Sequence, residues 1–332
     1  MALRMNRLYA VGGRQRTRTI NVEEWNRYNG GLILVLDPDR KEVLQQHDYL
    51  TPEQFRPSTP SPSILFKSAT LQDDRIYVCT QTEVMVYRLP GFEVEHHVSL
   101  PCFNDVHHVV PTASGSLLIA VTGLDLVLEI SVDGEVLREW SVTPDDTWDR
   151  FSREVDYRKR ETTKPHQSHP NFVFQNADDV WVTRFEQKDA ICLTAPGKRI
   201  DIGIERAHDG FVFGGKVYFT TVNGHVVEAD LATTEVTRVV DLNKFSEAEQ
   251  VLGWCRGLQV IDADHVLVGF SRIRPTKLHA NIIWLRNKLT DREIPESQPT
   301  HVALYNIGSG ELCWEINLED FGLNSVFTVY LV

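Results

Sequence analysis

Residues 207–222 read AHDGFVFGGKVYFTTV, which is a largely apolar run, a Gly-Gly turn and a second run rich in β-branched and aromatic residues. Such runs are typical of β-strands, and the glycine pair is typical of a tight turn between antiparallel strands. The same order returns along the chain, and the second strand of each unit begins in turn at Ile76, Leu117, Val180, Val217 and Val266. With one insertion set aside, this spacing matches the roughly 40–50 residues of a four-stranded propeller blade.

The two ends of the chain predict how the ring of blades closes. Residues 7–13 (RLYAVGG), 30–39 (GGLILVLDPD) and 41–49 (KEVLQQHDY) look like the second, third and fourth strands of a blade that lacks its first. Residues 324–332, NSVFTVYLV, form a lone strand. If this strand is the inner strand of the N-terminal blade, it closes the ring and removes two open sheet edges. We therefore predict an all-β, single-domain, six-bladed β-propeller.

The long connections are predicted to gather on one face of the propeller. We call it the top face; it carries the connections that enter the inner strands. A helix is expected over residues 143–159, within the insertion that follows the third blade. We assign blades to residues 1–50 with 324–332, 60–101, 104–143, 169–204, 208–245 and 255–321, and top-face insertions to 11–30, 144–168 and 274–299. Loops on a rigid scaffold commonly carry binding sites, so we expect the site on this face.

Composition narrows the class of protein. The 332 residues include 34 Lys and Arg against 46 Asp and Glu, a net charge of −12, which argues against nucleic acid as a partner. No apolar run is long enough to cross a bilayer, and the start, MALRMNRLYAVGGRQR, lacks the apolar core of a secretory signal. The five cysteines are scattered without a CxxC pair, which favours free thiols in a reducing cytoplasm. Oligomeric state stays open.

Histidines recur at the tops of the predicted inner strands. Aligning VHHVVPTASG, SHPNFVFQNADD, AHDGFVFGGK and CRGLQVIDAD brings four sets to equivalent positions: His107 with His108, His169 with Asn171, His208 with Asp209, and Arg256. We predict that His108, His169 and His208 line the channel mouth and bind Zn²⁺, Fe²⁺ or Mn²⁺. His107 and His108 point to opposite sides, so only one can face the channel, and a metal-free polar pocket is the alternative.

Other polar and aromatic residues are candidates for holding a ligand at the same mouth. Arginines on an acidic protein favour an anionic group, which a guanidinium binds in bidentate fashion. His166, in the charged segment 149–171, is interpreted as an ordinary loop histidine. The predicted ligand-binding residues are Asn171, Arg184, Trp254, Arg272 and Asn324, with Arg256 added to the three histidines as the catalytic set.

Residues 165–332 resemble a bacterial family of conserved hypothetical proteins of unknown function. The motifs that carry the resemblance are HPNFVF (169–174), AHDGFVFGGKVYF (207–219), GWCRGLQV (253–260), VGFSRIR (268–274) and NSVFTVYLV (324–332). The resemblance implies a propeller and marks His169, Asn171, His208 and Arg256, but it implies no reaction. In architecture alone the chain is also similar to gluconolactonase-type six-bladed propellers, whose Glu, Asn and Asp metal ligands are not matched here.

Two functions follow as expectations. The first is a metal-dependent enzyme that acts on a small polar, anionic metabolite by hydrolysis, elimination or isomerisation. The second is a non-enzymatic propeller that binds a ligand or a protein, with structural histidines and with Phe151, Tyr157, Trp284 and Leu285 as the contact set.

Overall fold

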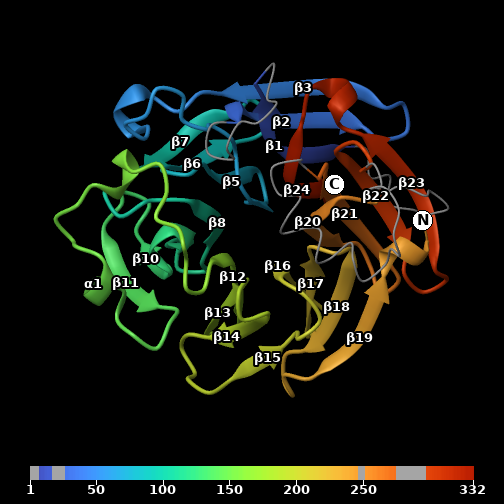
Figure 1. The fold of residues 1–332 in the computed structure, drawn as a ribbon. Coiled ribbons are helices and arrows are strands. Elements are labelled where there is room, and N and C mark those ends of the chain that lie inside the picture. Colours follow the sequence, from blue (N-terminus) through green and yellow to red (C-terminus); the bar gives the residue numbers. More distant parts are fainter. Residues whose placement is uncertain (1–6, 17–26, 246–250, 274–296) are drawn as a thin grey trace, which may run out of the picture.

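Short β-branched and aromatic runs joined by tight turns pair with the next run along the chain, and this builds antiparallel sheets. The computed structural model describes residues 7–16, 27–245, 251–273 and 297–332. Within these ranges the strands form six four-stranded sheets, and Figure 1 shows them around a common centre. The chain is a six-bladed β-propeller, which confirms the predicted fold.

Five blades each consist of four consecutive strands, numbered from the centre outward. The second and third blades hold β4 Ala69–Gln72, β5 Arg75–Cys79, β6 Val84–Arg88, β7 Glu93–Val98, β8 Val106–Pro111, β9 Leu117–Val121, β10 Leu126–Ile130 and β11 Val136–Ser141. The fourth to sixth hold β12 Pro170–Asn176, β13 Asp179–Arg184, β14 Asp189–Cys192, β15 Arg199–Asp201, β16 Ala207–Phe213, β17 Lys216–Thr221, β18 His225–Asp230, β19 Val236–Asp241, β20 Trp254–Val260, β21 His265–Ser271, β22 His301–Asn306 and β23 Glu311–Asn317.

The first blade is assembled from both ends of the chain. The C-terminal strand β24 (Ser325–Leu331) is its inner strand and pairs with β1 (Leu8–Gln15), which is followed by β2 (Tyr28–Asp37) and β3 (Glu42–Tyr49). This pairing confirms the predicted ring closure. The strands reach further than expected, since residues 11–15 and 28–30 of the predicted insertion 11–30 lie in β1 and β2.

The predicted helix over residues 143–159 is replaced by two short turns. The helix α1 spans only Thr147–Arg150, and the 3₁₀ helix η4 spans Tyr157–Lys159. The remaining short helices are η2 Glu53–Phe55, η3 Thr122–Leu124, η5 Leu242–Lys244 and η7 Glu319–Phe321. No helix within the described ranges is long and apolar enough to span a membrane. Most of the predicted insertion 274–299, with Trp284 and Leu285, lies outside the described residues.

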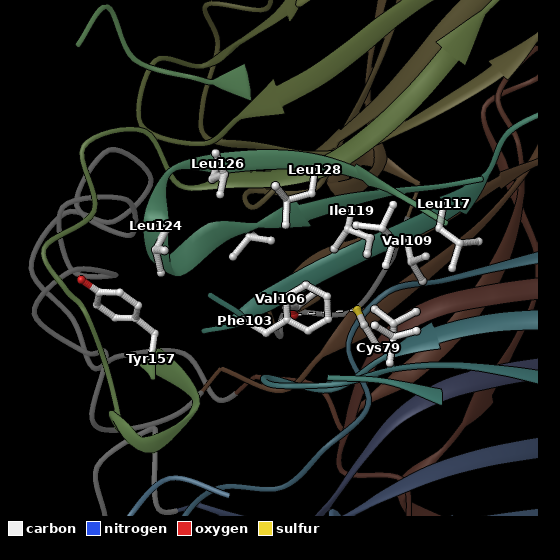
Figure 2. Packing of buried hydrophobic residues seen from close by; sticks show 14 residues of the cluster. Cys79, Phe103, Val106, Val109, Leu117, Ile119, Leu124, Leu126, Leu128 and Tyr157 are labelled. Carbon is white, nitrogen blue, oxygen red and sulfur yellow. Dashed lines mark hydrogen bonds between the residues drawn. The ribbon is translucent and has the colours of Figure 1, made fainter. Parts of the chain in front are cut away.

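The apolar core lies between neighbouring blades. Figure 2 shows the cluster formed by the second and third blades, where Cys79, Phe103 and Ile119 are fully buried. Tyr157 from the insertion 144–168 joins this cluster at 4% exposure, so it is not the exposed partner contact that the sequence suggested. Burying a large apolar side chain contributes about 1.5–3 kcal/mol, so Tyr157 fastens the insertion to the body of the propeller.

Hydrogen bonds also tie each blade to the next near the centre of the ring. The inner strands β24, β4, β8, β12, β16 and β20 contact one another in this order and close back on β24. In the same order, the links are Ala69 N–H to Thr328 Oγ1 (2.8 Å), Ser68 N–H to His107 O (3.0 Å), Val173 N–H to His108 Nδ1 (3.3 Å), Asn171 Nδ2 to Ala207 O (2.8 Å), Gly257 N–H to Asp209 Oδ2 (3.0 Å) and Ser271 Oγ to Val326 O (3.0 Å).

Candidate functional site

Five inner strands depart from regular pairing within their first four residues. The register shifts there in β8, β12, β16, β20 and β24, which leaves one or two residues of each inner strand without a partner on the next strand. Such a β-bulge bends the strand and re-aims a side chain. The bulged positions are His107, Asn171, Asp209 with Gly210, Arg256 with Gly257, and Phe327. Repetition of the bulge around the ring brings three of these side chains, His107, Arg256 and Phe327, into one cavity.

This cavity has a volume of about 820 Å³ and lies under the insertion 144–168, which supplies part of its lining. Four imidazoles and several aromatic side chains face it, together with five basic and three acidic groups. The imidazoles are His107, His166, His169 and His208; the charged residues are Lys67, Arg160, Lys164, Arg206, Arg256, Asp105, Glu161 and Glu186; the aromatic ones are Tyr28, Phe185, Trp254 and Phe327.

The imidazoles form a connected group. The ring centroid of His107 lies 4.9 Å from that of His169 and 6.3 Å from that of His208. His166 and His169 share a hydrogen bond of 2.9 Å between their Nδ1 atoms. One Nδ1 must donate and the other must accept, so one neutral ring has its proton on Nδ1 and the other has its proton on Nε2.

A buried carboxylate holds His169 in place. Asp125 is 1% exposed and accepts three consecutive backbone N–H groups, from Gln167, Ser168 and His169, at 2.8–3.0 Å. His169 has φ +58°, a left-handed conformation that costs free energy in a non-glycine residue and needs such support. The salt bridge from Arg150 to Asp125 (2.8 Å) completes this anchor.

A second buried side chain fixes the insertion further along. Asn104 donates from Nδ2 to the carbonyl groups of Tyr157 and Arg160, at 2.9 and 2.8 Å. Its Oδ1 accepts from the hydroxyl of Thr163 at 3.2 Å. Backbone N–H and C=O groups that are buried need hydrogen-bond partners, and here a side chain of the third blade provides them. The insertion therefore covers the cavity in a defined position.

The electrostatic environment keeps the imidazoles neutral. Burial holds the pKa of His107, His169 and His208 well below the usual range, and the charge of Lys67 at His107 and of Arg256 at His208 lowers it further. Burial alone would raise the pKa of Asp105, but Lys67, whose Nζ lies 3.1 Å from Oδ1, holds it well below the usual value. At neutral pH the site thus contains fixed cations beside uncharged imidazole bases.

The residues at this site do not fit the predicted metal centre. Among the residues that the structure describes, no group of three or more His, Cys, Asp or Glu side chains is placed to hold a metal ion. The Nδ1 atoms of His166 and His169 are bonded to each other, and Nδ1 of His107 donates to the carbonyl of Asp105 at 2.8 Å. The predicted Zn²⁺, Fe²⁺ or Mn²⁺ site at His108, His169 and His208 is therefore not supported by the geometry.

His107 faces the cavity, and His108 does not. The His108 ring stacks on Phe172 with centroids 3.6 Å apart, and its Nδ1 accepts the N–H of Val173. Its Nε2 lies 3.2 Å from Thr70 Oγ1. This corrects the assignment of His108 as a catalytic and metal-binding residue, because the ring links the second, third and fourth blades instead.

Two of the predicted ligand-binding arginines stabilise the scaffold. Arg184 makes a bidentate contact with the buried carboxylate of Asp189, at 2.7 and 2.8 Å. Arg272 makes a similar pair with Glu319, both distances being 2.8 Å. Neither arginine lines the cavity. Their guanidinium groups are committed to carboxylates within the chain, so the sequence assignment is corrected for both.

The two predicted asparagines are also structural. Asn171 is buried and donates to the carbonyl of Ala207 on the next blade. Asn324 accepts the N–H of Gln15 at 3.0 Å and so fixes the start of the closing strand. Neither side chain belongs to the lining of the cavity, which corrects their assignment as ligand-binding residues.

The structure brings together His169, His208, Trp254 and Arg256, as the sequence predicts. It adds His166, which the sequence suggested to be a loop histidine, together with Lys67 and Phe327. Lys67 precedes the inner strand of the second blade, and Phe327 lies in that of the first. Extending the alignment of inner strands from four blades to six would have found both.

Comparisons with known proteins identify the fold and no family. No family model and no curated protein matches the chain. A solved structure of a protein of unknown function from Bacteroides caccae superposes with a TM-score of 0.62 at 14% identity, covering 98% of both chains. Two further structures fall below a TM-score of 0.5. These are a chain of the mitotic checkpoint complex (0.48, 8% identity, 87% of this chain and 72% of that one) and the Cps50 (Swd1) β-propeller domain of Myceliophteria thermophila (0.49, 9%, 93% and 86%).

Proposed function

We propose that this chain binds a small anionic molecule in the cavity at the channel mouth and transfers a proton on it through the imidazoles of that cavity. The observation that carries the proposal is a reversal of charge. The chain as a whole has a net charge of −12, whereas five basic side chains line the cavity against three acidic ones. A concave site with an excess of positive charge attracts and concentrates anionic ligands.

The imidazoles supply the chemistry next to the basic groups. Neutral His169 and His166 are bases at pH 7, because burial lowers the pKa of both rings. Eliminations and isomerisations that pass through an enolate begin with removal of a proton from carbon next to a carbonyl or carboxylate. In that step a C–H bond breaks, its electron pair stays on the substrate, and an imidazole nitrogen takes the proton. The proton goes to Nε2 of His169, and the proton on Nδ1 of the same ring can then pass to Nδ1 of His166 along their hydrogen bond.

Two measurements test the two parts of the proposal. Binding is measured by titration calorimetry with small mono- and dicarboxylates, each paired with its uncharged amide, at low and high salt. Acids are expected to bind at least tenfold more tightly than their amides, with the difference reduced by salt. If acids bind no better than amides, the anion site is wrong.

Proton transfer is measured with the acids that bind. In D₂O, ¹H NMR follows exchange of the hydrogen next to the carboxylate. The wild type is expected to catalyse this exchange, His169→Asn to lose it, and the control His265→Asn, on a partly exposed strand end away from the cavity, to retain it. Binding without exchange would leave a ligand-binding module and contradict the catalytic part.

A further inference from the structure

We infer that Thr163 is a positioning residue, which fixes the protons of His166 and His169 so that Nε2 of His169 carries a lone pair. This inference rests on the proposed function, in which that nitrogen takes a proton from the bound molecule, and it adds the residue that keeps the nitrogen unprotonated beforehand. Both imidazoles line the cavity, and Thr163 belongs to the insertion 144–168 that covers it. Hydrogen bonds join the three side chains in one row.

The hydroxyl of Thr163 has three polar neighbours and one proton to share. It donates to the carbonyl oxygen of Gly123 in η3, and it lies 3.2 Å from Oδ1 of Asn104. The third neighbour is Nε2 of His166, at 3.4 Å. Oδ1 of Asn104 is assigned as the oxygen because the amide nitrogen donates to two backbone carbonyl groups. Two of the three neighbours can therefore only accept.

This set of neighbours decides the direction of the bond to His166. If the Thr163 hydroxyl donated to His166, the oxygens of Gly123 and Asn104 would both lie within hydrogen-bond distance of the hydroxyl oxygen with no proton between them. Gly123 and Asn104 are buried, and buried acceptors are costly to leave unsatisfied. The hydroxyl proton therefore goes to one of these oxygens, and Nε2 of His166 donates to the Thr163 oxygen.

The proton on Nε2 of His166 fixes that of the next ring. A neutral imidazole carries one N–H, so Nδ1 of His166 must accept. The 2.9 Å hydrogen bond between the two Nδ1 atoms is then donated by His169, which leaves the lone pair of His169 on Nε2. His107 has the same tautomer for a separate reason, since its Nδ1 donates to the carbonyl of Asp105 at 2.8 Å.

The same row of hydrogen bonds sets where the proton goes after it leaves the bound molecule. When the C–H bond breaks and Nε2 of His169 takes the proton, the proton on Nδ1 of His169 passes to Nδ1 of His166. His169 is then neutral again, and His166 holds the positive charge. Burial lowers the pKa of both rings; Asp105 and Asp125 oppose this at His166, and His107 adds to it at His169. His166 is thus the better final holder of the proton.

The first test determines the tautomers by NMR in the protein without a bound acid. Long-range ¹H–¹⁵N spectra of protein labelled with ¹⁵N in histidine distinguish ring nitrogens that carry a proton from those that carry a lone pair. His166→Asn and His169→Asn assign the two rings. Near pH 7.5, about one unit above the ordinary pKa of histidine, we expect the proton on Nε2 of His166 and on Nδ1 of His169. The opposite pattern would overturn the inference, and this measurement needs no variant of Thr163.

The second test removes the hydroxyl with Thr163→Val, which keeps the shape of the side chain. We expect mixed tautomers at His166 and His169 and an unchanged His107. Exchange of the hydrogen next to the carboxylate in D₂O should fall several-fold, because the competent tautomer is only partly populated and the charged His166 loses an acceptor. Affinity for the acid, measured by calorimetry, should not change.

Two further variants separate positioning from a purely structural effect. Thr163→Ser keeps the hydroxyl and should restore both the tautomers and the exchange. Thr143→Val is the matched control, since the Thr143 hydroxyl also donates to a backbone carbonyl, that of Asp145 at 3.1 Å, and its side chain does not line the cavity. It should behave as the wild type in all three measurements.

The contrary results are distinct. Wild-type tautomers in Thr163→Val would show that Thr163 does not set them, and the inference would be wrong. Changed tautomers with unchanged exchange would remove Thr163 from proton transfer, which also contradicts the inference. If the wild type has the expected tautomers and yet exchanges no hydrogen of any acid that binds, the proposed catalytic function fails, whereas the assignment of the protons to Thr163, His166 and His169 stands.

Discussion

Gly12 offers a sharp test of how the ring is closed. A Cβ added at Gly12 would lie 1.7 Å from the carbonyl oxygen of Ser325 and 3.1 Å from Cα of Val326, both in the closing strand β24. Real Cβ contacts essentially never fall below 3.0 Å, so Gly12→Ala must push β24 away from β1 by more than its hydrogen bonds tolerate. The pairs Gly12 with Val326 and Gly13 with Ser325 would then be lost.

The expected loss of stability is large for a single methyl group. Two ladder hydrogen bonds contribute about 1 kcal/mol each, and overpacking a tight contact costs about 1–3 kcal/mol. We therefore expect Gly12→Ala to lower the free energy of unfolding by about 3–5 kcal/mol. Gly30→Ala in β2 is the matched control. Its Cβ would meet Tyr49 O at 3.5 Å, an ordinary contact, so a change within about 1 kcal/mol is expected.

Urea unfolding followed by tryptophan fluorescence measures both variants, since the chain contains seven tryptophans. The difference between the two free energies of unfolding is the quantity of interest. If Gly12→Ala is as stable as Gly30→Ala, the close approach of β1 and β24 is wrong, and with it the closure of the first blade.

Three further predictions concern the support of the site. Asp125→Asn removes one carboxylate oxygen that accepts hydrogen bonds from the backbone of residues 167–169. Calorimetry should show weaker acid binding, and urea unfolding should show a free energy of unfolding lower by about 2–3 kcal/mol. Unchanged affinity for acids would refute the role of Asp125 as an anchor. Burial raises the pKa of Asp209 from an ordinary 3.8 to about 7, against the opposing influence of Thr220 and Arg256. Folding therefore favours the protonated carboxyl, and this contributes at most about 4 kcal/mol of stability, which is present below pH 4 and lost as the pH rises through 7. The free energy of unfolding, measured at several pH values, should depend less on pH in Asp209→Asn than in the wild type. The same pH dependence in both proteins would contradict this. Arg184→Gln removes one of the two arginines that pair with the buried Asp189, the other being Arg199, and should cost about 1.5–3 kcal/mol in urea unfolding without altering ligand affinity, whereas weaker binding would return Arg184 to the site.

The fold could be predicted because its signals are periodic. The spacing of the second strands gives the blade, and the lone strand at residues 324–332 gives the closure. Both signals survive small errors in strand boundaries. The helix expected over residues 143–159 was not formed, because buried residues of the third blade bind this segment: Asn104 donates to the carbonyl of Tyr157, and Asp125 accepts from the Thr147 hydroxyl and pairs with Arg150.

The candidate site was only partly predictable, for a local reason. Strand alternation assigns one side to each residue, but the bulges in five inner strands break this alternation where the site begins. Hence His107 takes the position expected of His108. Arg184 and Arg272 were assigned to the ligand for another reason: the sequence shows that each is positively charged, but it does not show which carboxylate each one pairs with. The pairing of Arg184 with Asp189 across β13 and β14 appears only once the strand register is known.

The most direct test of the central claim is a crystal structure of the protein with a monocarboxylic acid that binds in solution. We predict that the acid lies in the cavity lined by His107, His166 and His169, with its carboxylate beside basic side chains of that lining. An acid bound outside this cavity would contradict the account.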